Sequence, residues 1–275
     1  MAALARLPIF LALEGKRAIV AGDGPAAAWK AELLSAAGAD VDVFAECPCE
    51  ELCALAAQPP RGAIALRHRA WRVADFPGAA IAVGGFDDAP EAASFAAAAR
   101  AAGVPVNVID KPAYCDFTFG AIVNRSPLVI GISTDGAAPV FAQAIRARLE
   151  AMIPRGFARW AEAARRWRPT VQLSGLSFAA RLRFWQAFAR LALAQPERDP
   201  KPSNLGALLD ASAGDDMAGL GTVTLIDAGA CDLELLTLRA VRALQSADVV
   251  MIDDRVAPDI IDFARREARK MLIDA

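Results

Sequence analysis

An α/β fold with a parallel β-sheet is predicted for the first half of this chain, and three features of the sequence predict it. Short apolar runs alternate with segments of helix length, glycines close several of those segments, and a glycine-containing turn follows the first strand. Strands separated by helices form parallel β-α-β units, with helices on both faces of the sheet. Hydrophobic residues make up 55% of the sequence and charged residues 23%, which is a globular composition.

The first-half elements follow in a regular order. The apolar run 16–21 predicts a buried strand, and 26–37 predicts a helix that ends at Gly38. A second helix is predicted over 90–102, closed by Gly103. The remaining strand patterns lie at 41–43, 63–66, 79–83 and 104–109.

The second half has a different character. A strand at 128–132, a helix over 139–152 and a wholly helical stretch over 154–194 are predicted. The segment 195–221, rich in Pro, Asp, Gly and Ser, is the best linker candidate. After it we predict a strand at 222–226, a helix at 233–246 and another strand at 248–252. These are too few elements for a complete α/β domain.

Composition excludes several classes of partner. The net charge is −2 with no separate basic domain, so we expect no nucleic acid. No apolar run approaches the ~18–20 residues of a membrane span. The odd count of five cysteines favours reduced thiols in a cytoplasmic protein. The spacing of Cys47, Cys49 and Cys53 matches no common zinc pattern, and His68 is the only histidine, so no bound metal is predicted.

The turn after the first strand has the pattern Gly22-x-Gly24-x-x-Ala27. The first glycine permits a tight turn, the second lets backbone approach a pyrophosphate, and a small third residue lets the helix pack closely. The pattern predicts a Rossmann-like dinucleotide site, with further contacts from Pro25 and Ala26 at the helix N-terminus. An ordinary tight β-α turn is the alternative interpretation.

Two acidic residues near the end of the second strand are candidates to bind the adenine ribose. They are Asp42 and Glu46, and we include Cys47 beside them among the cofactor contacts. A carboxylate at this place favours NAD over NADP, because it repels a 2′-phosphate. The sequence does not decide which acid serves, and either is also compatible with a solvent-exposed role.

Four motifs further along the chain carry a resemblance to a known family. In chain order they are Asn-Val-Ile-Asp at 107–110, Cys-Asp-Phe at 115–117, Asn-Arg-Ser-Pro-Leu at 124–128, and the segment 132–139. Together they closely resemble the ordered motifs of siroheme synthases and of stand-alone precorrin-2 dehydrogenases. The opening Leu-Pro-Ile-Phe at 7–10 and Lys30 fit the same pattern, and the match runs from about residue 7 to 200.

The resemblance implies a domain organisation. The tail resembles the start of a uroporphyrinogen-III methyltransferase domain, although its glycine-rich loop at 227–232 is degraded and most of that domain is missing. We therefore expect a Rossmann-like NAD-binding domain at 1–117 and a dimerisation segment at 118–150. A small helical domain at 151–205, a linker at 206–220 and a partial methyltransferase-like remnant at 221–275 should follow.

The resemblance also implies an activity. Family members are homodimers that oxidise precorrin-2 to sirohydrochlorin with NAD, and several then insert ferrous iron to give siroheme. The family's catalytic aspartate corresponds to Asp110, which follows the last strand of the predicted sheet. Strand carboxyl ends are where ligands bind in such folds, so a proton-accepting carboxylate is expected there. A helix cap or a turn is the alternative for a lone aspartate.

The expected tetrapyrrole contacts lie in the same motifs: Asn107, Arg125, Ser133 and Thr134. Arg125 is equally compatible with a structural charge at the dimer interface. Thr134 stands where some members carry a phosphorylatable serine, and Asp135 stands where glycine is frequent. Two other functions remain open at this point, an iron or cobalt chelatase with weak dehydrogenase activity and a non-catalytic tetrapyrrole- or nucleotide-binding regulator.

Overall fold

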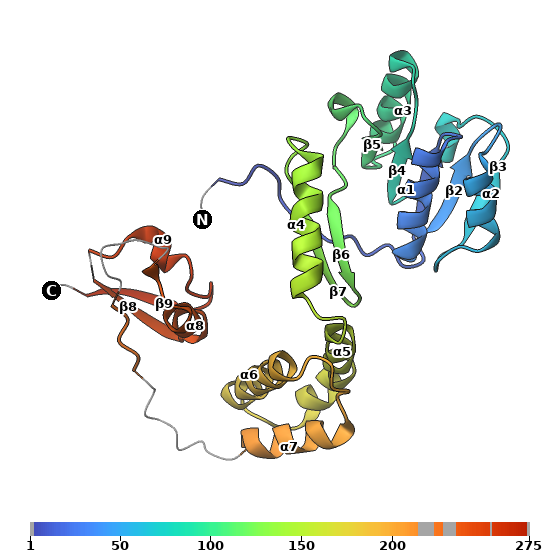
Figure 1. Cartoon of the computed structure of the whole chain (residues 1–275). Coiled ribbons are helices and arrows are strands. Elements are labelled where there is room, and N and C mark those ends of the chain that lie inside the picture. Colours follow the sequence, from blue (N-terminus) through green and yellow to red (C-terminus); the bar gives the residue numbers. More distant parts are fainter. Residues whose placement is uncertain (1–2, 214–222, 228–234, 254, 274–275) are drawn as a thin grey trace. The chain divides into compact units, whose positions relative to one another are not determined.

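The computed structural model describes residues 3–213, 223–227, 235–253 and 255–273 (Figure 1). The chain divides into two compact units, one formed by residues 5–158 and the other mainly by residues 159–275. The first unit contains the predicted sheet and is described first.

Five parallel strands form the sheet of the first unit, in the order β3-β2-β1-β4-β5. This arrangement confirms the predicted Rossmann-like α/β fold. The chain moves outward from β1 through β2 to β3 and then crosses back to β4, so the strand order reverses between β1 and β4. The strands are β1 (Arg17–Ala21), β2 (Asp40–Phe44), β3 (Ile64–Arg67), β4 (Ile81–Gly84) and β5 (Val106–Val108).

Helices cover both faces of the sheet (Figure 1). Leu34 of α1 and Leu52 of α2 pack on one face, and Phe95 of α3 packs on the other. Gly38 and Gly103 follow α1 and α3 with positive φ, as predicted. The sequence did not predict α2, which is only eight residues long. The bounds are α1 (Pro25–Ala36), α2 (Glu50–Ala57) and α3 (Ala89–Ala101).

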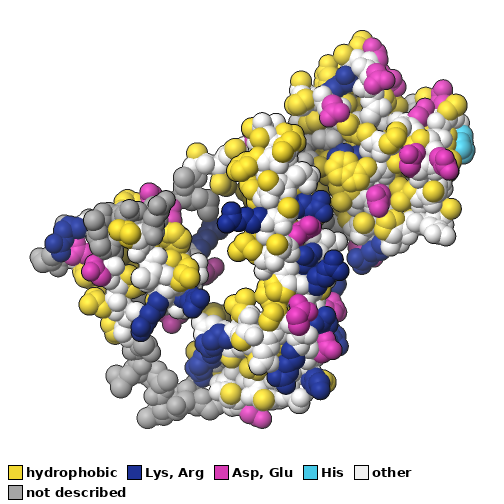
Figure 2. Space-filling view, viewed as in Figure 1, with side chains coloured by type: hydrophobic (Ala, Val, Ile, Leu, Met, Phe, Trp, Pro, Cys, Tyr) yellow, Lys and Arg dark blue, Asp and Glu magenta, His cyan; other side chains and the backbone are white. Residues whose placement is uncertain are grey.

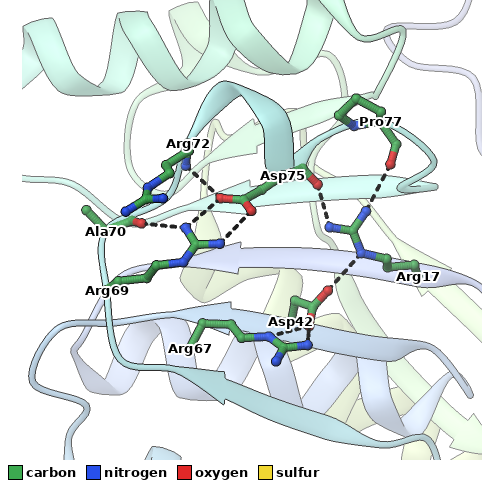
Figure 3. Close-up of polar contacts among 8 residues, drawn as sticks. All are labelled: Arg17, Asp42, Arg67, Arg69, Ala70, Arg72, Asp75 and Pro77. Carbon is green, nitrogen blue, oxygen red and sulfur yellow. Dashed lines mark hydrogen bonds and ion pairs between the residues drawn. The ribbon is translucent and has the colours of Figure 1, made fainter.

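A charged network covers β2 on the face that carries α3 (Figure 3). Asp42 of β2 pairs with Arg17 at 2.7 Å and with Arg67 at 2.9 Å. Arg17 also donates to the carbonyls of Asp75 and Pro77. Asp75 belongs to the short helix η1 (Val73–Asp75), so these bonds hold the connection between β3 and β4 against the sheet.

A β-hairpin and a helix complete the first unit. The strands β6 (Ala121–Arg125) and β7 (Leu128–Ile132) pair antiparallel, and α4 (Pro139–Met152) contacts both. The predicted strand and helix are confirmed, whereas β6 was not predicted. A short helix η2 (Pro112–Tyr114) precedes the hairpin.

The second unit contains a helical cluster built on aromatic packing. Edge-to-face contacts join Phe188 to Trp160, Trp167 and Trp185, with ring centroids 5.4–5.7 Å apart. The predicted helical stretch is therefore confirmed as two helices, separated by residues 174–177. The helices are α5 (Phe157–Leu173), α6 (Phe178–Ala194) and α7 (Pro202–Ala213).

The expected linker is wrong in its first part. Residues 206–213 belong to α7, where Leu205, Leu208 and Leu209 pack against the aromatic cluster at helical spacing. The glycine and serines of this segment suggested a loop, but the burial of these leucines decides in favour of a helix. The rest of the expected linker, 214–220, lies outside the described residues.

The tail contains α8 (Leu238–Ser246), β8 (Val249–Asp253), α9 (Pro258–Ile261) and β9 (Arg269–Ile273), and its two strands are parallel. A strand predicted at 222–226 is wrong over the described residues 223–226, where Val223 and Leu225 are fully exposed and no described strand pairs with them. The degraded loop at 227–232 lies almost wholly outside the described residues. No helix among the described residues is long and apolar enough to cross a membrane.

Candidate active site

A cavity of about 760 Å³ opens at the carboxyl edge of the sheet, where the strand order reverses. This is the place where open α/β sheets bind ligands. Loops after all five strands contribute to its walls. The lining residues are Ala21 to Ala27, Phe44, Glu46, Ala70, Trp71, Gly85 to Asp88, Glu91 and Ile109 to Lys111.

The turn after β1 forms one wall of this cavity. Gly22 has φ +141°, and a Cβ there would lie 3.0 Å from the Gly85 carbonyl oxygen and 3.3 Å from the Ala27 Cβ. At Gly24, by contrast, a Cβ would meet no atom within 4 Å. Gly24 precedes α1 and has no side-chain cap, so the helix N-terminus with Pro25 and Ala26 faces open space. Both properties fit a site for a pyrophosphate.

The structure separates the two acidic candidates for the ribose. Glu46 is exposed and lines the cavity. Asp42 does not line it, because its carboxylate lies within β2 and both oxygens are held by arginines (Figure 3). Cys47 is exposed and also lies outside the lining. Of these three candidates, Glu46 alone is placed to meet a nucleotide in the cavity.

Trp71 also lines the cavity, and the sequence did not predict this. Its ring makes edge-to-face contacts with Phe76 at 5.7 Å and with Phe95 at 5.3 Å. The loop that carries it is anchored by Arg69, whose guanidinium bonds both carboxylate oxygens of Asp75 at 2.7 and 2.8 Å. This hydrogen bonding from Arg69 lowers the pKa of Asp75, and the backbone N–H of Arg72 adds to the effect. An isolated tryptophan among arginines was the available sequence signal.

Asp110 follows β5 and has a positive φ of 57°, which is uncommon for a residue other than glycine. Its neighbours fix this conformation, since the N–H of Ile109 bonds the Gly84 carbonyl at 2.8 Å and that of Lys111 bonds the Val108 carbonyl at 3.1 Å. Among the described residues its carboxylate makes no hydrogen bond and caps no helix. Asp110 is exposed at the cavity wall, so its carboxylate is available to a bound molecule.

Lys30 lies on α1 and is only 7% exposed. Its ammonium lies 4.0 Å from the centre of the Trp29 ring and 4.1 Å from that of Phe119. Burial lowers the pKa of Lys30 to about 8, although the charges of Asp110 and Cys115 act in the opposite direction. No hydrogen bond or ion pair to the ammonium occurs in the described parts of the chain.

The four expected tetrapyrrole contacts do not line the cavity. Asn107 is buried and donates to the Phe117 carbonyl at 2.9 Å. Arg125 ties the hairpin to the end of α4 by donating to the carbonyls of Ile153 and Glu150 at 3.2 and 3.1 Å. Both side chains are therefore engaged in internal contacts.

Ser133 and Thr134 lie in the loop between β7 and α4. The Ser133 hydroxyl accepts from the N–H of Asp135 at 3.2 Å, and the Thr134 hydroxyl lies 3.4 Å from the Ala138 carbonyl. Asp135 has φ 52° and pairs with Arg6 at 2.5 Å. The positive φ explains how a loop that often has glycine here keeps its shape with an aspartate.

Three protein-family models match the chain. Residues 9–121 match an NAD(P)-binding family, residues 125–152 the central family of sirohaem biosynthesis proteins, and residues 222–274 the tetrapyrrole (corrin/porphyrin) methylases. The sheet and its cavity therefore belong to a domain of the type that binds a nicotinamide dinucleotide. The match of the tail agrees with the resemblance found in the sequence.

Curated relatives match nearly the whole chain. A siroheme synthase of Pseudomonas paraeruginosa is 39% identical over 269 residues, covering 97% of this chain and 57% of the relative. One of Ectopseudomonas mendocina is 40% identical with the same coverage, and one of Methylococcus capsulatus is 39% identical, covering 96% and 56%. The chain thus spans a little over half the length of these relatives.

Among solved structures, "SirC, precorrin-2 dehydrogenase" superposes with a TM-score of 0.54 at 16% identity. The match covers 75% of this chain and 98% of that one. At this identity the similarity concerns the fold.

A Lys30→Met substitution is expected to stabilise the protein at pH 7 by roughly 1–3 kcal/mol, because it removes a desolvated charge. The folded state holds the Lys30 proton more weakly than the unfolded chain does. The gain should therefore be complete below pH 8 and shrink as pH rises from about 8 towards 10.5. Urea unfolding across this range measures it, with exposed Lys16→Met as the control. A variant less stable than the wild type at pH 7 would show that the buried Lys30 charge does not destabilise the folded protein.

Proposed function

The chain belongs to the siroheme synthase family, of whose curated members it spans about 57% of the length, and on this premise we propose that it catalyses the NAD-dependent oxidation of precorrin-2 to sirohydrochlorin. The observation that carries the proposal is that one cavity is lined both by the glycine turn after β1 and by Asp110, whose carboxylate has no hydrogen bond among the described residues. The glycine turn and the open space at the N-terminus of α1 favour this activity over the alternative of a chelatase that oxidises poorly.

The residues present fit a nicotinamide dinucleotide. The open space above Gly24 and the uncapped N-terminus of α1 suit a pyrophosphate, and Glu46 suits the adenine ribose hydroxyls. Trp71 and Phe44 supply apolar surface in the same cavity. The cofactor, when bound, supplies the hydride acceptor.

Asp110 is the proposed base. Oxidation of the substrate removes a hydride and a proton, and the Asp110 carboxylate would accept the proton. Its exposed position at the cavity wall and the lack of an internal partner among the described residues support this role. The same carboxylate is suited to accept pyrrole N–H protons when ferrous iron, as a second substrate, enters the product.

An Asp110→Asn variant is expected to lose NADH formation from precorrin-2 by a factor of at least 100, within the range that a positioned base contributes. NAD binding should be unchanged, because the turn at Gly22 is untouched. An anaerobic assay with enzymatically made precorrin-2, following NADH and the sirohydrochlorin spectrum, measures this. Exposed Asp262→Asn, in the other unit, is the matched control.

Two results would contradict the assignment. Full activity of the Asp110→Asn variant would show that another group takes the proton. An absence of NADH formation by wild-type protein that binds NAD would remove the dehydrogenase itself. Ferrous iron added to the completed reaction tests the chelatase step by the siroheme spectrum.

NAD is the proposed cofactor rather than NADP, because the Glu46 carboxylate repels a 2′-phosphate. Glu46→Ser should therefore narrow the NAD-over-NADP ratio of kcat/KM by about tenfold. The variant Asp42→Ser tests whether Asp42, rather than Glu46, determines this cofactor preference. It should leave this ratio unchanged and lower the thermal stability, since it leaves Arg17 and Arg67 without their shared carboxylate. A ratio that responds to Asp42 rather than Glu46 would reverse the assignment.

A homodimer formed through the hairpin and α4 is the proposed assembly. Val140 and Phe141 of α4 are 83% and 60% exposed, Met152 is 67% exposed, and Val129 on β7 is also exposed. Figure 2 shows hydrophobic side chains gathered along α4. Exposed apolar patches of this kind mark interaction surfaces.

Phe141→Glu is expected to convert a dimer to a monomer, since it puts a charge into the apolar contact. Light scattering coupled to size exclusion at micromolar concentration measures the mass. Phe178→Glu is the control, because Phe178 is 78% exposed but lies on α6. A wild-type monomer, or a dimer that only the Phe178 variant disrupts, contradicts the proposed interface.

A further inference from the structure

Lys30 is the single charged side chain among the buried residues of the described structure. The three other buried polar side chains all have internal partners: Ser35 bonds the Gly62 carbonyl, Asn107 that of Phe117 and Ser212 that of Leu208. The Lys30 ammonium has neither a hydrogen bond nor an ion pair within the same described residues. A buried polar group without a partner costs free energy, and a charged one costs more.

Aromatic rings are the immediate surroundings of this ammonium. It lies 4.0 Å from the ring centre of Trp29 and 4.1 Å from that of Phe119. Ring faces attract a cation but accept no directed hydrogen bonds as oxygen does. The described residues therefore leave the three N–H groups of the ammonium without an acceptor.

Two titratable groups on the neighbouring loops act on Lys30 by their charge. They are Asp110 after β5 and Cys115 after η2, and neither forms an ion pair with it. The Cys115 sulfur is already engaged with the backbone of Val108. Lys30 therefore lies near the proposed base without being neutralised by it.

We propose that Lys30, between Trp29 and Phe119 and near Asp110, binds a carboxylate of the tetrapyrrole substrate and so positions the ring system over the base. This inference rests on the proposed function and adds a binding residue to it. Trp29 is 56% exposed, so its ring offers an apolar surface beside the ammonium. A flat macrocycle that carries acidic side chains matches this pairing of aromatic surface and buried cation.

The cofactor phosphates are a less suitable ligand for Lys30. The pyrophosphate site is the turn from Gly22 to Ala26, and Lys30 is not among the residues that line that cavity. It lies more than a helical turn further along α1, at about 1.5 Å rise per residue. The anion that Lys30 binds is therefore expected to belong to the substrate rather than to the cofactor.

The test compares the full-length wild type with Lys30→Gln, Lys30→Arg and exposed Lys16→Gln. Uroporphyrin, an air-stable porphyrin polycarboxylate, is the probe, and its fluorescence reports binding. Lys30→Gln should bind it about ten- to a hundredfold more weakly, the range for a hydrogen-bonded charge. Lys30→Arg should recover part of the affinity, Lys16→Gln should behave as wild type, and all four should bind NAD equally.

The pH profile separates a binding role from a structural one. Wild-type affinity for uroporphyrin should fall as pH rises through about 8, where free Lys30 loses its proton, and the Lys30→Gln profile should lack this step. With precorrin-2 in the anaerobic assay, Lys30→Gln should raise KM more than it lowers kcat. Equal uroporphyrin binding by wild type and Lys30→Gln, or no binding by wild type, overturns the proposal.

The outcomes distinguish the role of Lys30 from the dehydrogenase activity itself. Wild-type NADH formation with a KM that Lys30→Gln leaves unchanged overturns the role of Lys30 and leaves the dehydrogenase intact. A wild type that forms no NADH overturns the dehydrogenase, whatever Lys30 does to porphyrin binding.

Discussion

The close approach of two loops at the carboxyl edge of the sheet is the constraint on which the site depends. Gly22 after β1 lies so near the Gly85 carbonyl that a Cβ would be 3.0 Å from it, and the Gly85 N–H bonds the Ala21 carbonyl at 2.8 Å. This contact fixes where α1 begins and therefore where its N–H groups point. The pairing of β5 with β4 also brings Asp110, which follows β5, to the same cavity.

Two buried or mostly buried charged groups in the first unit differ in their partners. Asp42 is mostly buried, and two arginines satisfy both of its oxygens, so its charge is committed to holding the β3–β4 connection. Lys30 is more deeply buried, and its ammonium lies over two aromatic rings without a hydrogen bond or ion pair among the described residues. Folding gains nothing evident from leaving an ammonium in this state. The contrast is the physical reason to assign a structural role to the first and a ligand to the second.

The sequence predicted all five strands of the sheet, because each is a short apolar run or, in β2, an alternation of valine with aspartate. It missed α2, whose eight residues present only Leu52 fully to the core, and it interpreted residues 206–213 of α7 as part of a linker. It identified the turn at Gly22 and the position of Asp110, since both signals are local. It could not choose between Asp42 and Glu46 or find Trp71, because those roles depend on which strands and loops become neighbours across the sheet.

Two features near the proposed base are unfavourable to the folded chain by itself. Asp110 has a left-handed backbone without being glycine, and Lys30 keeps a desolvated charge. Conformations of this kind persist where the surrounding structure enforces them, and they cluster at functional sites. Here an inter-strand hydrogen bond from the Ile109 N–H to the Gly84 carbonyl and a turn hydrogen bond from the Lys111 N–H to the Val108 carbonyl hold the residues on either side of Asp110. The stability of the sheet thus allows the proposed site to keep two charged groups that have no hydrogen bond or ion pair among the described residues.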